Sequence, residues 1–400
     1  MLTLLTALLP YAFLPTAYGA CINASSNPKA VYTMTNDVPN SILAFAVSTN
    51  LSLEIPVSVA TGGNGGQSIA KGVPNYPDTL ASGHSVEVFD RYLFNVNAGS
   101  NSVSMFEIAI TDPTQLRLLG AFPAPGDFPV SLAVAHSIVC VGFAGARTGV
   151  SCAPWDSTGI GSFDLIRPTA SNDTRQVTPP DVSFDIACLT DILFTGDGSA
   201  LVAVATGSNI STDSTLTVWP LDYTTGQLAL EESGRASLPG IRVGFSGASL
   251  PGTSQLFLTD GLTGAFVVDT ASLYHGDDDD DDDDDDVLLS HTVVPGQIAS
   301  CWAQVHEETG LGFIADSNLN RFVQVDVSTG EIRRTFNSTN GNDGYLDVKI
   351  VGDTLFALGV REQPRAKFIS VFDLAGDVGD VENVPIPGGD VLGMGLAVFV

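Results

Sequence analysis

Three residues that can transfer protons stand at comparable positions in this sequence. His84 lies in "LASGHSVEVF", and Asp191 and Asp347 lie in "CLTDILF" and "GYLDVKI", where each opens an apolar, strand-like segment. A histidine titrates near neutral pH and a carboxyl group can accept or donate a proton, so this set could perform general acid–base catalysis. The chain has no G-x-S-x-G motif, and its sequence therefore gives no sign of a nucleophilic serine.

Two further residues could hold a substrate. Arg147, in the turn between Cys140 and Cys152, is the best-placed cation for a carboxylate, because a guanidinium group offers planar, paired donors. Trp302 could form a stacking wall. Each candidate also has a structural alternative: His84 as a strand-end residue, Asp191 as a turn cap, and Trp302 as an aromatic packed between sheets.

The elements that must position these residues repeat along the chain. The unit is a strand, a turn rich in Asn, Asp and Gly, and a second strand with alternating apolar residues, as in "YLFNVNAGSNSVSMFEI" and "LGFIADSNLNRFVQVDV". Few windows keep a helical apolar period without a Gly or Pro break. One turn position is shared by Asn36, Asn97, Asp260 and Asp316. Hydrogen bonds to the nearby backbone are the expected role of these four side chains, and metal binding is the alternative.

Seven such units, each of about 50 residues, predict an all-β fold, a seven-bladed β-propeller. "VLGMGLAVFV" at the C-terminus looks like an inner strand with no partner after it. "VYTMTN" looks like a second strand with no inner strand before it. We expect these two segments to pair and close the ring, which removes an open sheet edge. The expected blades are 31–61 with 391–400, 82–124, 128–168, 186–238, 242–294, 297–337 and 344–386.

The inner strands of a propeller line a central channel, so the residues that open them form a ring of candidates. The equivalent positions are His84-Ser85, Val130-Ser131, Thr190-Asp191, Phe245-Ser246, Cys301-Trp302, Leu346-Asp347 and Met394-Gly395.

A series of motifs carries a family resemblance: "VYTMTND", "TGGNGGQSI", "VNAGSNSVSMFEI", "FPVSLAVAHSIVCV", "TLTVWPLD" and "GQIASCWAQVHEETGLGFIAD". In these segments the chain resembles the lactonase-type seven-bladed propellers and, more narrowly, the secreted fungal 3-carboxymuconate-cyclase-like proteins. The likeness covers nearly the whole chain and keeps the order of the motifs. In one blade the Pro-His motif of the lactonizing enzymes is replaced by Pro129-Val130-Ser131.

The resemblance implies acid–base chemistry at the channel without a metal or cofactor. It makes His84, Asp191 and Asp347 the catalytic candidates and Arg147 and Trp302 the substrate-binding ones. The implied reaction is the cyclisation or hydrolysis of a small lactone or unsaturated carboxylic acid. With only 16 Lys and Arg, the chain is poor in groups that bind carboxylates. Enzymatic activity is therefore left open, and the alternative is a non-catalytic secreted or cell-wall-associated glycoprotein, an adhesin or scaffold for a cell-wall or host-surface ligand.

The N-terminal segment and the cysteines point to secretion. Residues 1–20 have the apolar run and small-residue end of a signal peptide, and residues 21–400 would then form a single propeller domain. In an oxidising compartment we expect a disulfide between Cys140 and Cys152; the pairing of Cys21, Cys188 and Cys301 is left open. The glycosylation sequons are at Asn23, Asn50, Asn172, Asn209 and Asn337.

Charge excludes some partners. The formal charge of −29 disfavours nucleic acid and anionic lipid. After residue 20 no apolar stretch is long enough to insert in a membrane, and we expect a monomer. The run Asp277–Asp286 repels itself, so we expect a solvated, disordered loop between two outer strands of the fifth blade, one that can be deleted without loss of folding.

Overall fold

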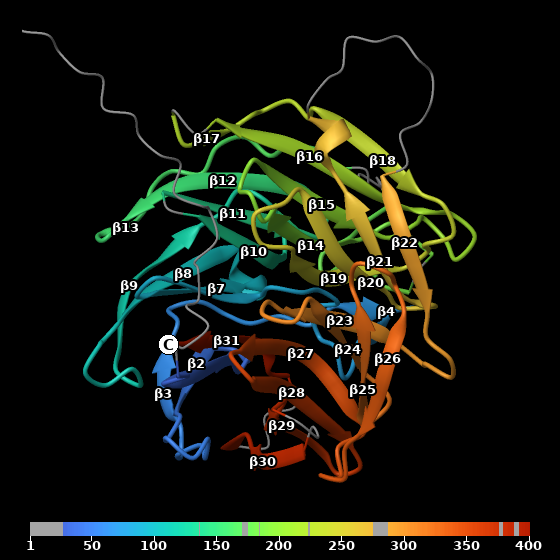
Figure 1. The fold of residues 1–400 in the computed structure, drawn as a ribbon. Helices are drawn as coiled ribbons and strands as arrows, with labels where there is room; N and C mark the ends of the chain where they lie inside the picture. Colours follow the sequence, from blue (N-terminus) through green and yellow to red (C-terminus); the bar gives the residue numbers. More distant parts are fainter. Residues whose placement is uncertain are drawn as a thin grey trace, which may run out of the picture.

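Seven antiparallel sheets follow one another around a central axis in a computed structural model of the chain (Figure 1). The structure describes residues 27–135, 137–169, 175–183, 185–222, 225–274, 287–375, 379–387 and 392–400. The expected signal peptide, Cys21, Asn23, Asn172 and the run Asp277–Asp286 lie outside these residues. The ring of sheets confirms the predicted seven-bladed β-propeller.

Each blade has four positions for strands, counted outward from the axis. The inner strands, from blade one to blade seven, are β31 (Met394–Phe399), β6 (Val86–Phe89), β10 (Pro129–Ala135), β14 (Leu189–Phe194), β19 (Gly244–Ser249), β23 (Ser300–His306) and β27 (Gly344–Val351). The second strands are β1 (Ala30–Met34), β7 (Tyr92–Asn97), β11 (Ile138–Phe143), β15 (Ala200–Ala205), β20 (Gln255–Asp260), β24 (Leu311–Asp316) and β28 (Thr354–Glu362).

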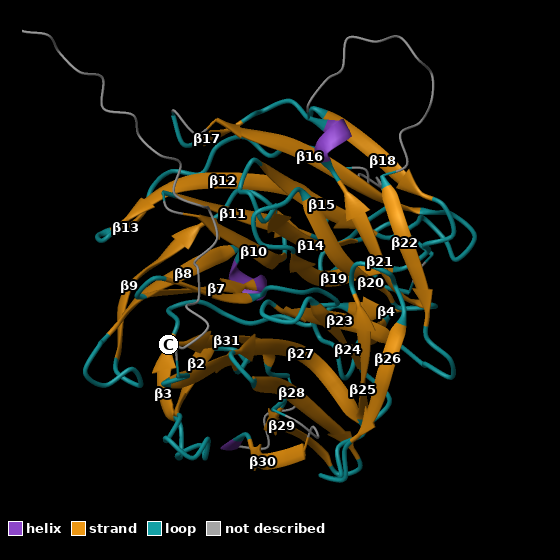
Figure 2. Ribbon diagram, viewed as in Figure 1, coloured by secondary structure: helices purple, strands orange, loops and turns teal. Residues whose placement is uncertain are grey.

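The third and fourth positions complete the blades. The third strands are β2 (Ser41–Ala46), β8 (Ser102–Ile108), β12 (Gly149–Asp156), β16 (Ser214–Asp222), β21 (Gly264–Asp269), β25 (Arg321–Asp326) and β29 (Arg365–Asp373). The outermost are β3 (Val57–Ala60), β9 (Leu116–Pro123), β13 (Gly159–Ile160), β17 (Gln227–Leu228) with β18 (Gly234–Leu238), β22 (Leu288–Val293), β26 (Ile332–Asn337) and β30 (Gly379–Pro385). A small hairpin, β4 (Ile69–Ala70) with β5 (Val73–Pro74), and the short 3-10 helices η1 (Ala98–Ser100) and η2 (Ala271–Leu273) lie outside the blades (Figure 2).

Burial explains why the strands differ in composition. The second strands β7, β11 and β15 are buried at every residue, because both faces pack against neighbouring blades, and they are accordingly rich in apolar residues. The outermost strands β18, β22 and β26 alternate between more and less exposed residues, as a strand with one face in water does. The core therefore runs around the ring between the sheets.

The two ends of the described chain close the ring. Strand β31 pairs with β1, with Ala30 opposite Phe399 and Val31 opposite Val398 (Figure 1). This confirms the expected pairing of the C-terminal segment with the first blade. Leu396 of β31 is fully buried, so closure also places an apolar strand beside the axis.

Three of the four shared turn residues bind the backbone. Asp260 accepts the Val243 N–H at 3.0 Å, and Asp316 accepts the N–H groups of Ile298 and Ala299 at 2.8 and 3.1 Å, so both fix the chain where it enters an inner strand. Asn36 adopts a positive φ of 55° and Asn97 binds Ser104. In the described part of the chain, no three His, Cys, Asp or Glu side chains come together as metal ligands. Asn36 also accepts the Gly66 N–H at 3.0 Å, so hydrogen bonding to the backbone is observed for three of the four residues, whereas Asn97 bonds to side chains.

Candidate acid–base site in the central channel

Several inner strands pair irregularly with the second strand of their blade at the positions where the sequence repeat places the candidate residues. The register shifts lie between Pro129 and Ser131, between Leu189 and Asp191, between Ser300 and Trp302, and between Tyr345 and Val348. A bulge places two residues opposite one and redirects a side chain. Here the bulges allow polar side chains of consecutive blades to meet near the axis.

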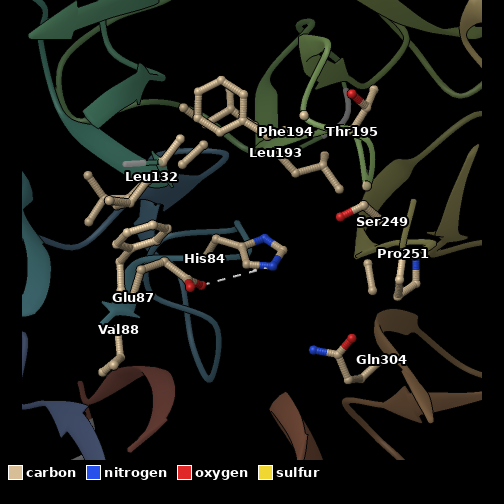
Figure 3. A pocket seen from close by; sticks show the side chains of 18 of the residues that line it. His84, Glu87, Val88, Leu132, Leu193, Phe194, Thr195, Ser249, Pro251 and Gln304 are labelled. Carbon is tan, nitrogen blue, oxygen red and sulfur yellow. Dashed lines mark ion pairs between the residues drawn. The ribbon is translucent and has the colours of Figure 1, made fainter. Parts of the chain in front are cut away.

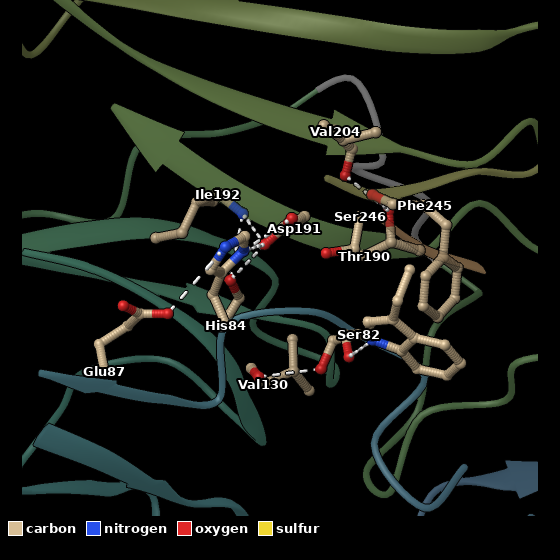
Figure 4. Close-up of polar contacts among 12 residues, drawn as sticks. Ser82, His84, Glu87, Val130, Thr190, Asp191, Ile192, Val204, Phe245 and Ser246 are labelled. Carbon is tan, nitrogen blue, oxygen red and sulfur yellow. Dashed lines mark hydrogen bonds and ion pairs between the residues drawn. The ribbon is translucent and has the colours of Figure 1, made fainter. Parts of the chain in front are cut away.

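His84 and Asp191 are joined by a short contact in the channel (Figure 4). The imidazole Nδ1 lies 2.9 and 3.0 Å from the two carboxylate oxygens of Asp191, whose side chain is 0% exposed. His84 has a positive φ of 51°, and its carbonyl accepts the Leu132 N–H at 2.8 Å. Gly83 permits the close approach, because a Cβ there would lie 3.0 Å from Asp191 Oδ2 and 2.0 Å from Ser246 Oγ. Blade three contributes Ser131, whose hydroxyl donates to Asp191 Oδ1 at 2.9 Å.

A second pair of charges faces the other nitrogen of His84. Lys349 Nζ donates to Glu87 Oε1 at 2.8 Å, and the same oxygen lies 4.0 Å from His84 Nε2. The side chains of Lys349 and Glu87 are only 14% and 22% exposed. Burial lowers the pKa of Lys349, but the charges of Glu87 and Asp347 more than offset burial, so this pKa lies above its usual value. Lys349 is therefore a fixed cation at neutral pH.

The pKa of His84 reflects opposing effects. Burial lowers this pKa and the charge of Lys349 acts in the same direction, but the carboxylates of Asp191 and Glu87 outweigh both, so the pKa of His84 lies above its ordinary value. Because Nδ1 faces a carboxylate, the neutral ring keeps its proton on Nδ1 and leaves the lone pair on Nε2. A proton acceptor thus faces away from Asp191.

That side of the ring borders a cavity of about 380 Å³ at the mouth where the inner strands end (Figure 3). Gln304 and Ser249 turn their polar groups into the same space as the imidazole. Gln304 Oε1 accepts the Val305 N–H at 3.0 Å, so the oxygen is held and the amide N–H groups can donate. The remaining wall is mainly apolar and includes Val88, Phe89, Leu132, Leu193, Phe194 and Pro251.

The third acid–base candidate, Asp347, is engaged by the backbone. Its oxygens accept the N–H groups of Val348 and Leu396, each at 2.8 Å, so it ties the inner strand of blade seven to the closing strand. Burial raises its pKa to about 6, and the charges of Lys349 and His84 oppose this rise. Asp347 thus lies in the electrostatic range of the pair but does not border the cavity described above.

The two expected substrate-binding residues lie elsewhere. Arg147 is 60% exposed and pairs with Asp127 at 2.7 Å on a loop of blade three. Trp302 is buried, donates its indole N–H to the Ser82 carbonyl at 3.3 Å and packs edge-on against Phe245. Trp302 thus takes the packing position that was its structural alternative, and neither residue borders the cavity beside His84.

Sequence reasoning missed Glu87, Lys349 and Gln304. A usable signal was present: Glu87 follows His84 by three residues across a bend, and Lys349 follows Asp347 by two residues along an inner strand. Charged residues inside strands that are otherwise apolar seldom occur without a partner or a role. The partner could not be read from the sequence, because Glu87 and Lys349 are 262 positions apart.

A second cavity, of about 430 Å³, lies at the opposite mouth, where the inner strands begin. Asp78 and the free thiols of Cys188 and Cys301 line it. Segment 62–83 covers this mouth: the Thr79 hydroxyl donates to the Leu392 carbonyl at 2.9 Å and the Ile69 N–H to the Pro180 carbonyl at 2.9 Å. Burial raises the pKa values of Cys188, to about 12, and of Cys301, so both thiols are protonated at neutral pH.

The cysteines also form the expected cross-strand bridge. Cys140 and Cys152 face each other on β11 and β12 and are joined by a disulfide. Cys188 and Cys301, whose pairing the sequence left open, are free. Within the described residues, no helix is long and apolar enough to cross a membrane.

The chain is similar to known proteins in its fold and not in its sequence. Neither a protein-family model nor a curated protein matches the sequence. Among solved structures, a candidate 6-phosphogluconolactonase from Bacteroides fragilis aligns with a TM-score of 0.63 at 12% identity, over 94% of this chain and 99% of that one. A protein from Lactobacillus plantarum aligns with a TM-score of 0.62 at 12% identity, over 94% and 100% of the two chains.

A propeller with a different use is also similar. Sqt1 from Chaetomium thermophilum, solved bound to the N-terminus of the ribosomal protein L10, aligns with a TM-score of 0.50 at 13% identity, over 86% of this chain and 80% of that one. At such identities the likeness extends to the propeller fold alone, since one fold serves unrelated functions. The chain shares its architecture with a lactonase candidate and with a peptide-binding protein.

Proposed function

We propose that the protein hydrolyses or forms a small lactone in the cavity beside His84. The observation that carries this proposal is the contact of 2.9 Å between His84 Nδ1 and Asp191, which leaves Nε2 on the cavity side. Resemblance to the lactonase-type propellers, and in particular to the fungal 3-carboxymuconate-cyclase-like proteins, agrees with it.

The chemistry in the hydrolytic direction follows from the positions of these groups. His84 Nε2 takes a proton from water, and the water oxygen attacks the ring carbonyl. Gln304 and Ser249 would donate hydrogen bonds to the carbonyl oxygen as it becomes negative. The imidazolium, stabilised by Asp191, then gives the proton to the ring oxygen as the C–O bond breaks, which yields the hydroxy acid. Ring closure is the reverse sequence.

The test is turnover of a panel of lactones by the wild type and by His84→Gln. We expect hydrolysis by the wild type and a loss of about 100-fold or more in kcat/KM for the variant, the usual contribution of general acid–base catalysis. His291→Ala is the matched control, because His291 lies exposed on the outer strand β22 and should leave turnover unchanged. Equal turnover by His84→Gln would overturn the assignment of His84. No turnover of any lactone would favour the binding-scaffold alternative.

We also propose that the protein is a secreted glycoprotein. The three sequon asparagines within the described residues, Asn50, Asn209 and Asn337, are all exposed, as attachment of a glycan requires. Intact mass measurement of the protein from the culture medium of a eukaryotic host, before and after removal of N-glycans, tests this. An unchanged mass, or retention of the protein within the cells, would overturn it.

A further inference from the structure

The charges that line the cavity beside His84 restrict its ligand. Of the described residues that border it, only His84, Glu87, Glu307 and Lys349 can carry a charge. Two of these four are carboxylates, and the fully buried carboxylate of Asp191 lies directly behind His84. No arginine is among the described lining residues, although guanidinium groups are the usual partners of carboxylate and phosphate ligands.

The one lysine at the cavity is already neutralised. Lys349 Nζ donates to Glu87 Oε1 at 2.8 Å, and the Asp347 carboxyl lies close enough to affect its titration. A phosphate or carboxylate of a ligand would have to compete with Glu87 for this ammonium group and would meet Glu87 itself, a like charge. The formal charge of −29 on the whole chain opposes the entry of anions as well.

The rest of the cavity wall favours an apolar ligand. Phe89, Leu193 and Phe194 come from the ends of two inner strands, Leu132 from the middle of the inner strand between them, and Pro251 from the turn after a fourth. In Figure 3, Leu132, Leu193 and Phe194 lie along one side of the space that His84 faces, and Gln304 and Ser249 lie on the other sides. A cavity with an apolar side and a few convergent polar groups is typical of sites for small, largely apolar molecules.

We propose that the substrate of this site is an uncharged lactone with an apolar substituent, and that Glu87 enforces this choice by neutralising Lys349. The proposal rests on the function proposed above and names its substrate class. The ring carbonyl would lie near Gln304 and His84, and the substituent against Leu132, Leu193 and Phe194. Phosphorylated sugar lactones and lactones with several carboxylates are disfavoured by the same groups.

The first experiment compares three probes with the wild type: δ-decalactone, which is uncharged and apolar; glucono-δ-lactone, which is uncharged and polar; and 6-phosphogluconolactone, which is an anion. We expect δ-decalactone to have the highest kcat/KM and 6-phosphogluconolactone the lowest. If turnover depends on His84 but 6-phosphogluconolactone is preferred, the substrate class is wrong and the acid–base function stands.

A binding measurement separates the two proposals further. Calorimetry with δ-decanolactam, the ring amide that resists hydrolysis, and with 6-phosphogluconate tests the cavity without any turnover. Binding of the lactam, weakened by Leu132→Asp, is the expected result. Binding of 6-phosphogluconate in preference to the lactam would overturn the substrate class even if no lactone is turned over.

Glu87→Gln tests the specificity residue. Loss of the carboxylate frees the Lys349 ammonium group, so the ratio of kcat/KM for a lactone with one carboxylate to that for δ-decalactone should rise by about tenfold or more, the usual effect of a hydrogen bond to a charged group. Glu307→Gln is the control: it removes the same charge at the exposed rim of the cavity, where, among the described residues, Glu307 forms no ion pair with Lys349, and it should change the ratio less.

A double variant guards against misfolding. An unpaired Lys349 in a poorly solvated position could prevent Glu87→Gln from folding. Glu87→Gln with Lys349→Met removes both charges, and it should keep the preference for δ-decalactone without any gain for the carboxylated lactone. A gain equal to that of Glu87→Gln, or an unchanged ratio in a folded Glu87→Gln protein, would overturn the role of Glu87.

Discussion

His84 Nδ1 lies 2.9 Å from Asp191 Oδ1, although the two residues are 107 positions apart and belong to blades two and four. The propeller brings them together because consecutive inner strands converge on one axis, and Ser131 of the blade between them also binds Asp191. The pKa of His84 therefore depends directly on the charge of Asp191.

Asp191→Asn should lower the pKa of His84. The carboxylate stabilises the imidazolium, and without its charge the burial of the ring and the charge of Lys349 act against protonation. NMR titration of the His84 resonance, assigned by its loss in His84→Gln, measures the change, and the acidic limb of any activity profile should move to lower pH with it. Asp353→Asn removes the carboxylate beside His306 and should leave His84 unchanged. An unaltered pKa in Asp191→Asn would contradict the electrostatic account.

The sequence predicted the fold better than the site. Strand alternation, turn residues and the two unmatched ends indicated seven blades and their closure, because each of these signals is local or concerns only the ends of the chain. His84 and Asp191 could be placed on the channel because the repeat aligns equivalent positions. The ion pair between Glu87 and Lys349 depends on how blades two and seven meet near the axis, and no local pattern contains that information. The contact of Trp302 with Phe245 joins the neighbouring blades five and six, and it matches the packing position that was the structural alternative for Trp302.

Asp78→Asn should stabilise the protein at alkaline pH. Burial raises the pKa of Asp78 to about 7, against the effects of the Ala81 N–H and Lys367. The folded state therefore holds this proton to higher pH than the unfolded state, and stability falls as pH rises from about 4 to about 7. Relative to the wild type, we expect a gain on the order of 1–3 kcal/mol at pH 8 and almost none at pH 4, measured by urea unfolding.

Asp326→Asn provides the opposite control for this measurement. Its hydrogen bonds with Arg333 and Ser328 lower the pKa of Asp326, so its contribution is present above the ordinary carboxyl pKa and is lost as pH falls. Asp326→Asn should reduce stability at pH 8, by a small amount because the pair is solvated. If both variants responded to pH in the same direction, the assignment of Asp78 would be wrong.

Removal of the disulfide should destabilise blade three. Cys140 and Cys152 lie opposite each other on β11 and β12, and their bond closes a short loop with a sequence separation of 12. For a loop of this length, the double variant Cys140→Ala with Cys152→Ala should lose about 2–3 kcal/mol in chemical unfolding. Cys188→Ala is the control, since it removes a buried thiol that forms no bond in the structure. If the double variant lost no more free energy of unfolding than Cys188→Ala, the disulfide would not stabilise the protein by restricting the unfolded chain.

Deletion of residues 392–400 should open the ring. These residues contain β31, the inner strand of blade one, and without it the N–H and C=O groups of β1 that face β31 lose their partners. The loss includes the fully buried Leu396, whose N–H also binds Asp347 beside the acid–base site. We expect a protein that aggregates and unfolds without a cooperative transition, measured by size-exclusion chromatography and circular dichroism. A synthetic peptide of residues 392–400 should restore the monomer, and a scrambled peptide should not. A truncated protein that stays monomeric and unfolds at the original midpoint would show that the ring does not depend on this strand.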